Sequence, residues 1–213
     1  MDRYPMTAKE LLEAAEKLTR ENGSEATPWD ARLLLAHALG GRSPLSLDLL
    51  QELEAPAASR FQALWERRLG GEPVQHLLGE WDFYGRPFFV DRRALVPRPE
   101  TEILAAAALA EAPDSRRAID LGAGGGVLAI TYLLERPESR AVALDASLEA
   151  LALSRANARR HGVHGRLALA ASDWLSAVGT ARFDLAMSNP PYLSVSEEAS
   201  LPRTVSKHDP ARA

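Results

Sequence analysis

The sequence predicts an α/β fold with a parallel sheet in its second half, preceded by a small helical bundle. After Arg117, short apolar runs alternate with helical patterns, which is typical of βαβ units. Before residue 73, apolar residues recur at helical spacing. Between these parts, two aromatic-rich runs flank a glycine-containing turn, which indicates a β-hairpin. We therefore expect a helical bundle, a hairpin linker and an α/β domain at residues 1–72, 73–96 and 97–213.

The first part is predicted to hold four short helices. Thr7-Ala8-Lys9-Glu10 is a capping box, in which the threonine hydroxyl and the glutamate carboxylate each accept an amide at the start of a helix. A second helix is expected after Thr27-Pro28, because the missing N–H of a proline costs nothing in the first turn. A third helix is expected from Ser43-Pro44 and a fourth around Phe61–Leu69. Several short helices in sequence predict a bundle.

The hairpin and the sheet are predicted from short apolar runs bounded by turn residues. The hairpin strands Glu80–Phe83 and Pro87–Val90 flank Tyr84-Gly85-Arg86. Residues 97–101 are too rich in proline for a helix or a central strand, and they lead into an alanine-rich helix at residues 103–110. The strands of the sheet are expected at residues 118–121, 141–145, 166–170 and 183–188, with helices at residues 127–134 and 148–160.

Composition and charge exclude several classes of function. The 213 residues include no cysteine, which excludes disulfides, thiolate metal sites and cysteine nucleophiles. The histidines lack metal-ligand spacing, so no metal is expected. The formal net charge is −4 without a basic stripe, so direct binding of nucleic acid is not expected. The sequence shows neither a signal peptide nor a membrane span, which predicts a cytoplasmic protein without a membrane partner.

Three segments that follow successive predicted strands are candidates for ligand binding. Asp120-Leu121-Gly122-Ala123-Gly124-Gly125-Gly126 can turn tightly and approach a ligand at the edge where open α/β sheets bind ligands. Asp145 ends the next strand, and its carboxylate can accept from both hydroxyls of a ribose. Asp173-Trp174 can accept from an adenine amino group and cover its face. The alternatives are a plain turn, a helix-capping aspartate and an ordinary loop pair.

Together these segments describe an adenosine nucleoside that carries a nearly uncharged chain. The glycine segment contains no lysine or arginine that could neutralise phosphates. S-adenosylmethionine fits this description, and its methionine part would lie near Asp120 and Gly122.

The segment Asn189-Pro190-Pro191-Tyr192 follows the fourth predicted strand. Asn189 Oδ1 and the Pro190 carbonyl can accept both hydrogens of a planar NH2 group, and Tyr192 can pack on its plane. An amide nitrogen is a poor nucleophile because its lone pair is delocalised. Two acceptors would hold it in line and raise its electron density, so we expect these four residues to be catalytic. The alternative is a turn stiffened by proline.

The chain resembles the bacterial peptide chain release factor glutamine methyltransferases, which are class I S-adenosylmethionine-dependent methyltransferases with a Rossmann-like sheet. The resemblance is carried by residues 73–80, 95–102, 120–126 and 189–192. It implies methyl transfer to the side-chain amide nitrogen of the glutamine in the Gly-Gly-Gln loop of a release factor, which the helical part would bind. It also implies a set of cofactor contacts, Gly122 to Gly126, Asp145, Trp174 and Asn189, and a glutamine pocket of residues 189–192 with Arg98 and Glu100.

The chain departs from the family pattern in two places. Gly125 stands where the family usually has a small polar residue. The family also continues well beyond Ala213, with strands that complete the sheet. We therefore expect the chain to be a fragment whose exposed sheet edge promotes association, and its activity in isolation is left open.

Two other functions stay open at this point. A nucleic-acid amine methyltransferase would use residues 189–192 on an adenine or guanine NH2 group, although the acidic charge counts against it. A non-catalytic fragment would bind the cofactor without transferring a methyl group.

Overall fold

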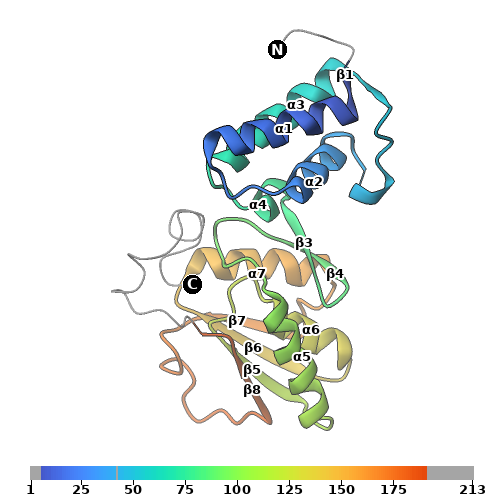
Figure 1. The fold of residues 1–213 in the computed structure, drawn as a ribbon. Helices are drawn as coiled ribbons and strands as arrows, with labels where there is room; N and C mark the ends of the chain where they lie inside the picture. Colours follow the sequence, from blue (N-terminus) through green and yellow to red (C-terminus); the bar gives the residue numbers. More distant parts are fainter. Residues whose placement is uncertain (1–5, 42, 191–213) are drawn as a thin grey trace. The chain divides into compact units, whose positions relative to one another are not determined.

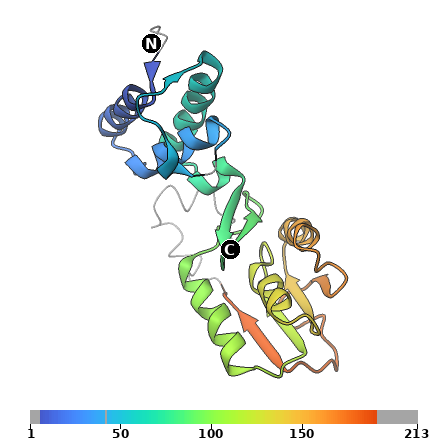
Figure 2. The same cartoon turned by 90° about the vertical axis from the view of Figure 1, so that its right-hand side faces the viewer.

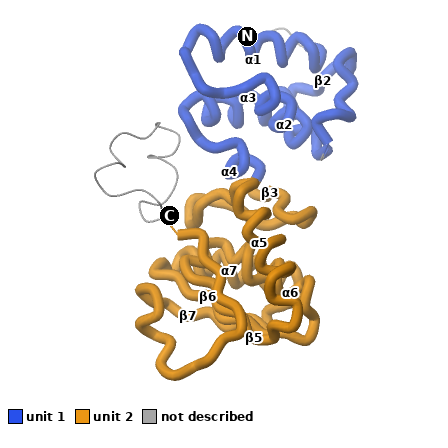
Figure 3. The backbone as a smooth tube through the Cα atoms, turned by 60° about the horizontal axis from the view of Figure 1, so that its bottom comes forward, with its two compact units in different colours: residues 1–78, 203–208 blue, residues 79–202, 209–213 orange. Residues whose placement is uncertain are grey.

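The computed structural model describes residues 6–41 and 43–190, which divide into two compact units between Leu78 and Gly79 (Figure 3). Across these residues, every helix is too short or too polar to cross a lipid bilayer.

The first unit is built from helices that share one apolar core (Figure 1). Leu34, Leu35 and Phe61 are among its most deeply buried side chains. A short antiparallel strand pair and a single 3-10 turn connect the helices. The elements are β1 (Met6–Thr7), α1 (Ala8–Asn22), α2 (Pro28–Ala38), η1 (Pro44–Ser46), β2 (Glu52–Leu53), α3 (Ala55–Leu69) and α4 (Val74–Leu78).

The predicted starts of α1 and α2 are confirmed by their capping geometry. The backbone N–H of Thr7 donates to Glu10 Oε2 at 2.8 Å, and the N–H of Glu10 donates back to Thr7 Oγ1 at 3.3 Å. Thr27 and Asp30 form the same reciprocal pair at α2. These local bonds satisfy the amides that a helix start leaves unpaired, which is why sequence spacing could identify them.

Two elements of the first unit differ from the prediction. The third predicted helix is only the 3-10 turn η1. The linker that was expected from residue 73 instead begins with α4, which belongs to the helical unit because it buries Val74 and Leu77 in that unit's core. A helix of five residues is too short for apolar periodicity to reveal it.

The second unit contains a four-stranded parallel sheet, as predicted. Its strands are β5 (Arg117–Leu121), β6 (Arg140–Asp145), β7 (Leu167–Ala171) and β8 (Leu185–Ser188). Their order is β7-β6-β5-β8, so β5 pairs with β6 on one side and with β8 on the other. The order of the strands reverses at β5, and ligands of open α/β sheets bind at the carboxyl ends of strands at such a reversal.

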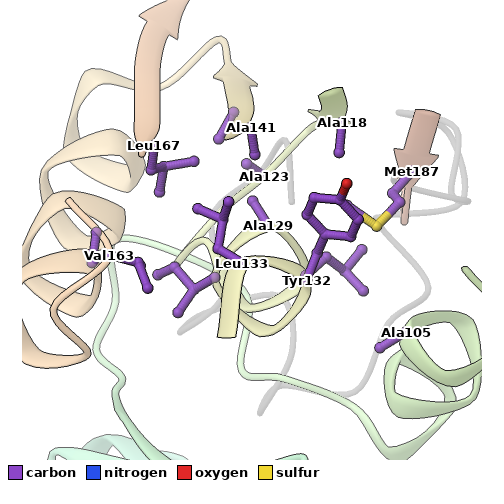
Figure 4. Packing of buried hydrophobic residues seen from close by; sticks show 14 of the residues in the cluster. Ala105, Ala118, Ala123, Ala129, Tyr132, Leu133, Ala141, Val163, Leu167 and Met187 are labelled. Atoms are coloured by element: carbon purple, nitrogen blue, oxygen red, sulfur yellow. The ribbon is translucent and has the colours of Figure 1, made fainter. Parts of the chain in front are cut away.

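Helices α5 (Pro99–Glu111), α6 (Val127–Glu135) and α7 (Leu148–Arg160) pack with the sheet around one core. Figure 4 shows Ala105 of α5 and Tyr132 of α6 in this cluster with Ala118 and Met187 of the strands. The Tyr132 hydroxyl is buried and donates to the Ser115 carbonyl at 2.9 Å. The core therefore fixes the strand ends at which the candidate site lies.

Helix α5 begins earlier than the sequence indicated. Its first residue is Pro99, within the segment that was judged too rich in proline for a helix. That judgement was wrong because a proline in the first helical turn lacks only an N–H that has no helical partner anyway. The residues after Pro99 are therefore helical, and they include Thr101, which faces the candidate site.

The predicted hairpin is confirmed as β3 (Glu80–Phe83) and β4 (Arg86–Phe89). Tyr84 and Gly85 form a two-residue turn with φ values of 52° and 70°, and hairpins favour such turns because their twist matches that of the strands. The hairpin belongs to the second unit and lies beside α7 (Figure 2). Arg160 Nη2 of α7 donates to Glu80 Oε2 at 2.8 Å.

Candidate active site

A cavity of about 520 Å³ lies where the loops after all four strands of the sheet meet. It brings together most of the residues that the sequence predicted, namely Arg98, Asp120, Gly122, Ala123, Gly124, Gly125, Asp145, Asp173, Trp174 and Asn189. Glu100, Gly126 and Pro190 are described but do not line it. Pro191 and Tyr192 lie outside the described residues.

The glycine loop is anchored to the end of β6. The N–H of Gly124 donates to Asp145 Oδ2 at 2.8 Å, and the N–H of Ala123 donates to the Leu144 carbonyl at 2.9 Å. Gly122 and Gly124 have left-handed φ values of 69° and 53°, which glycine adopts without the strain that a side chain would cause. The loop can therefore present its backbone to a ligand at close range.

Gly126 has a packing role in this structure. It precedes α6 with a φ of 81°, and a Cβ atom at this position would lie 2.3 Å from Ser154 Oγ of α7. Its lack of a side chain thus permits α6 and α7 to approach each other. This is why the last glycine of the predicted loop is absent from the cavity wall.

Asp145 joins the glycine loop to the start of α7. Its Oδ2 accepts from Gly124, and its Oδ1 accepts from the N–H of Ser147 at 2.8 Å. Ser147 in turn caps α7 by accepting from the N–H of Ala150 at 3.2 Å. Each carboxylate oxygen has two lone pairs, so both retain capacity to accept from hydroxyl groups of a ligand.

Asp120 is the most buried ionisable group of the cavity, with 1% of its surface exposed. Its Oδ2 accepts from the N–H of Ala129 in the first turn of α6 at 3.1 Å. Burial raises the pKa of this carboxyl to about 7, the nearby charge of Asp145 acts in the same direction, and the bond from Ala129 opposes both. A cationic ligand group in the cavity would favour the ionised carboxylate.

Trp174 stands at the rim of the cavity and is 54% exposed. Its φ of 51° is left-handed, which is uncommon for a bulky residue. Ser172 stabilises this turn, because its hydroxyl donates to the Trp174 carbonyl at 2.7 Å and accepts from the N–H of Ala177 at 3.1 Å. The indole is thus held at the cavity by a specific backbone turn.

Asn189 follows β8 and contacts the first turn of α5. Its Nδ2 donates to Thr101 Oγ1 at 3.1 Å, and both residues line the cavity. Thr101 was missed as a site residue by the sequence analysis, although it lies within the segment that carries the family resemblance. The contact joins positions 88 residues apart, and spacing cannot reveal such a pair.

Asn157 of α7 is a second residue that the sequence analysis missed. It is fully buried, and its Oδ1 accepts from the N–H of Phe89 at 2.8 Å. Its Nδ2 donates to the Phe89 carbonyl at 3.1 Å and to the Gly125 carbonyl at 2.9 Å. One side chain therefore connects the hairpin, α7 and the glycine loop.

The site does not resemble a metal centre. In residues 6–41 and 43–190, no group of three or more histidine, aspartate or glutamate side chains is arranged to hold a metal ion. The charged side chains that line the described cavity are two arginines, Arg93 and Arg98, and three aspartates, Asp120, Asp145 and Asp173.

Comparison with known proteins places the chain in one family. Residues 10–79 match the family model described as the PrmC N-terminal domain, and residues 99–204 match the methyltransferase small domain. A release factor glutamine methyltransferase of Cereibacter sphaeroides is 43% identical over 96% of this chain and 73% of its own length. The Chlorobaculum tepidum and Escherichia coli proteins of the same name are 41% and 36% identical, over 96% and 84% of this chain and 74% and 65% of their own lengths. The chain therefore belongs to the release factor glutamine methyltransferase family.

Proposed function

We propose that this chain transfers a methyl group from S-adenosylmethionine to the side-chain amide nitrogen of the glutamine in the Gly-Gly-Gln loop of peptide chain release factors. Membership of the family supports the methylation of release factors. The single observation that carries the amide assignment is the position of Asn189, whose side chain lines the same cavity as the glycine loop and Asp145.

The charges of the cavity suit a cationic cofactor. Three aspartates, Asp120, Asp145 and Asp173, line it together with two arginines. One of these arginines, Arg93, is paired with Asp91, with Nη2 to Oδ2 at 2.6 Å. The volume of about 520 Å³ is in the range of small-molecule sites. When bound, S-adenosylmethionine supplies a methyl group that its sulfonium makes electrophilic.

Each wall of the cavity has a proposed part in holding this cofactor. The glycine loop and Asp120 would hold the methionine part, since the loop offers backbone groups and Asp120 offers a buried carboxylate. Asp145 already accepts from two backbone N–H groups, and the remaining lone pairs of its carboxylate oxygens would accept from the ribose hydroxyls. Asp173 and Trp174 would bind the adenine edge and face.

Asn189 and Pro190 would hold the substrate amide. Asn189 Oδ1 and the Pro190 carbonyl would accept from the glutamine NH2 group and direct the nitrogen lone pair at the methyl carbon. Such acceptors also stabilise the positive charge that develops on nitrogen, so positioning and electrostatics supply most of the catalysis. Arg98, which lines the cavity, is the proposed contact for the rest of the glutamine.

Glu100, Tyr192 and the helical unit are also proposed to contact the release factor. Glu100 is exposed and lies off the cavity wall, so its contact with substrate would be made at the entrance. Tyr192 keeps its proposed packing role on the planar amide. The helical unit would bind the release factor away from the reacting loop.

The test compares protein and nucleic acid as acceptors of label from S-adenosylmethionine. We expect label in a release factor, loss of label when the glutamine of its Gly-Gly-Gln loop is replaced by alanine, and none in tRNA or DNA. Label only in nucleic acid would overturn the proposal in favour of amine methylation of a base. Cofactor binding without label in any acceptor would indicate a non-catalytic fragment.

A variant of the active site completes this test. Asn189→Ala is expected to abolish transfer while the cofactor Kd stays within about tenfold, or ~1.4 kcal/mol, of the parent value. Asn22→Ala is a matched control, because Asn22 is exposed on α1 and its Nδ2 donates to the Leu18 carbonyl of the same helix. An Asn189→Ala protein that retains most of its activity would contradict the role of Asn189.

A further inference from the structure

We propose that Ser172 is a positioning residue that holds Trp174 at the rim of the cavity and thereby strengthens the binding of the cofactor's adenine. Both residues line the cavity, and the Ser172 hydroxyl donates to the Trp174 carbonyl at 2.7 Å. This inference deepens the proposed function and rests on it, because it concerns the indole that is proposed to cover the adenine face.

Ser172 is the fixed residue from which the turn at Trp174 begins. It follows β7 directly, and only 8% of its surface is exposed. The pairing of β6 with β7 ends at Asp145 and Ala171, and the N–H of Ser172 continues it by donating to the Asp145 carbonyl at 3.0 Å. The backbone of Ser172 is therefore tied to the residue whose carboxylate would accept from the ribose.

The partners of the Ser172 hydroxyl determine which bonds it donates and which it accepts. A carbonyl oxygen can only accept, so the single hydroxyl hydrogen of Ser172 goes to Trp174. The N–H of Ala177 can only donate, so it uses one lone pair of Ser172 Oγ at 3.1 Å. The Ser176 hydroxyl, 3.2 Å away, is then the donor to the second lone pair. Because these three partners use its hydrogen-bonding capacity, we expect Ser172 to act through the turn and not by contact with the ligand.

The turn at Trp174 depends on these bonds. Its φ of 51° is unfavourable for an L-residue, because the Cβ atom comes too close to the following carbonyl oxygen. Trp174 and Leu175 are 54% and 55% exposed, so packing in the core contributes little to holding them. Without the Ser172 hydroxyl, the segment would sample other backbone conformations, and the indole would have to be ordered when the cofactor binds.

A double-mutant cycle of Ser172→Ala and Trp174→Ala tests this inference, with the Kd of S-adenosylmethionine measured by titration calorimetry. Ser139→Ala is the matched control. Ser139 is 2% exposed, and its hydroxyl donates to the Ser115 carbonyl at 3.1 Å. It precedes β6, whose other end lines the cavity. The control therefore removes a buried hydroxyl and its bond to a backbone carbonyl without a change at the cavity.

We expect Ser172→Ala to weaken cofactor binding by about threefold, because part of the stacking interaction is lost. In the Trp174→Ala background the same change should weaken binding by less than about 1.5-fold, since two residues that act through one contact are not additive. Ser139→Ala should bind like the parent protein. An equal loss in both backgrounds would overturn the inference, because Ser172 would then act without Trp174. So would parent affinity in Ser172→Ala, or equal losses in Ser172→Ala and Ser139→Ala.

A second readout is independent of the proposed function. The indole N–H resonance of Trp174, assigned by its absence in Trp174→Ala, should shift in 15N-labelled Ser172→Ala and stay in place in Ser139→Ala. An unshifted resonance in Ser172→Ala would overturn the role of Ser172 even if the parent enzyme is active. The expected shift and affinities in a protein that labels no release factor would support the role of Ser172 while the proposed methyl transfer fails.

Discussion

The side-chain amide of Asn157 donates to the carbonyl oxygen of Gly125 at 2.9 Å and ties helix α7 to the loop that lines the cavity. The same side chain bonds both backbone groups of Phe89 in the hairpin. Asn157 is fully buried and these bonds are part-buried, so its removal would leave the backbone groups of Phe89 and Gly125 without this partner.

Asn157→Ala is therefore expected to lower the free energy of unfolding by about 2–4 kcal/mol. Urea unfolding measures this change, with Asn22→Ala as the control for losing an asparagine at the surface. The cofactor Kd should also weaken, since Gly125 lines the cavity. A loss below about 1 kcal/mol would contradict the bridging role.

Neighbouring glycines of the glycine loop should respond differently to alanine. Gly126→Ala introduces a left-handed alanine and a contact of 2.3 Å with Ser154 Oγ, so a loss of about 2–3 kcal/mol is expected. At Gly125, the nearest atoms to a new Cβ, Asn157 Nδ2 and Leu153 Cδ2, both lie at 3.6 Å, and its φ is not left-handed. Gly125→Ala should therefore change stability by less than about 1 kcal/mol.

A double variant separates the contact at Gly126 from its backbone strain. Ser154→Ala removes the closest atom, so the Gly126→Ala and Ser154→Ala changes should be non-additive, with part of the loss recovered. The left-handed φ of 81° remains, which limits the recovery. Additive losses in thermal unfolding would show that the Ser154 hydroxyl oxygen is not the neighbouring atom that matters.

The buried carboxyl of Asp120 predicts a pH dependence of stability. Its pKa is raised from 3.8 to about 7, chiefly by burial, so between these values the folded chain holds a proton that the unfolded chain has released. Raising the pH through this window therefore lowers the free energy of unfolding, by up to about 1.4 kcal/mol per pH unit from this group. The contribution is complete below pH 3.8 and lost above about pH 7.

Asp120→Asn tests this dependence because the amide oxygen can still accept from Ala129 but does not ionise. As the pH rises from 5 to 7.5, the free energy of unfolding of the parent protein should fall relative to that of the variant, and the difference should then level off. A difference that is constant with pH would show that Asp120 is ionised throughout.

Trp174 should contribute to cofactor affinity and little to stability. It is 54% exposed at the rim of the cavity, so Trp174→Ala removes a stacking surface without opening the core. A stacking contribution of about 0.5–1.5 kcal/mol predicts a loss of cofactor affinity of about three- to tenfold. Titration calorimetry measures this affinity. Trp29→Ala in the helical unit is the control, since that indole is 46% exposed and far along the chain from the glycine loop. Equal affinities of the two variants would contradict the adenine contact.

Local sequence signals predicted much of the second unit correctly. Helix α7 has the predicted bounds, Leu148–Arg160, because Ser147 caps it through a bond to Ala150 three residues away. The four strands are found where short apolar runs alternate with helices, although β8 begins at Leu185 rather than Phe183. The glycine loop and Asp145 were predicted to meet at the strand ends, and both line the cavity there.

The sequence could not reveal the bonds that position the site. Thr101 and Asn157 act on partners 88 and 32 residues away, and these pairings exist only after the helices pack on the sheet. Gly126 was predicted to contact the cofactor as part of the glycine segment, and its close approach to Ser154 of α7 could not be predicted from spacing. Such contacts form only in the packed structure, so they cannot be predicted from composition or from the spacing of residues along the chain.

The strand order β7-β6-β5-β8 also means that the last strand made, β8, pairs with the first, β5. Different parts of the site can therefore form at different times during synthesis. A chain made from its N-terminus can pair β5, β6 and β7 as soon as residue 171 is available, which brings the glycine loop and Asp145 together. Asn189 reaches Thr101 only after β8 has been made and has inserted beside β5. During synthesis, the glycine loop and Asp145 can therefore come together before Asn189 reaches Thr101.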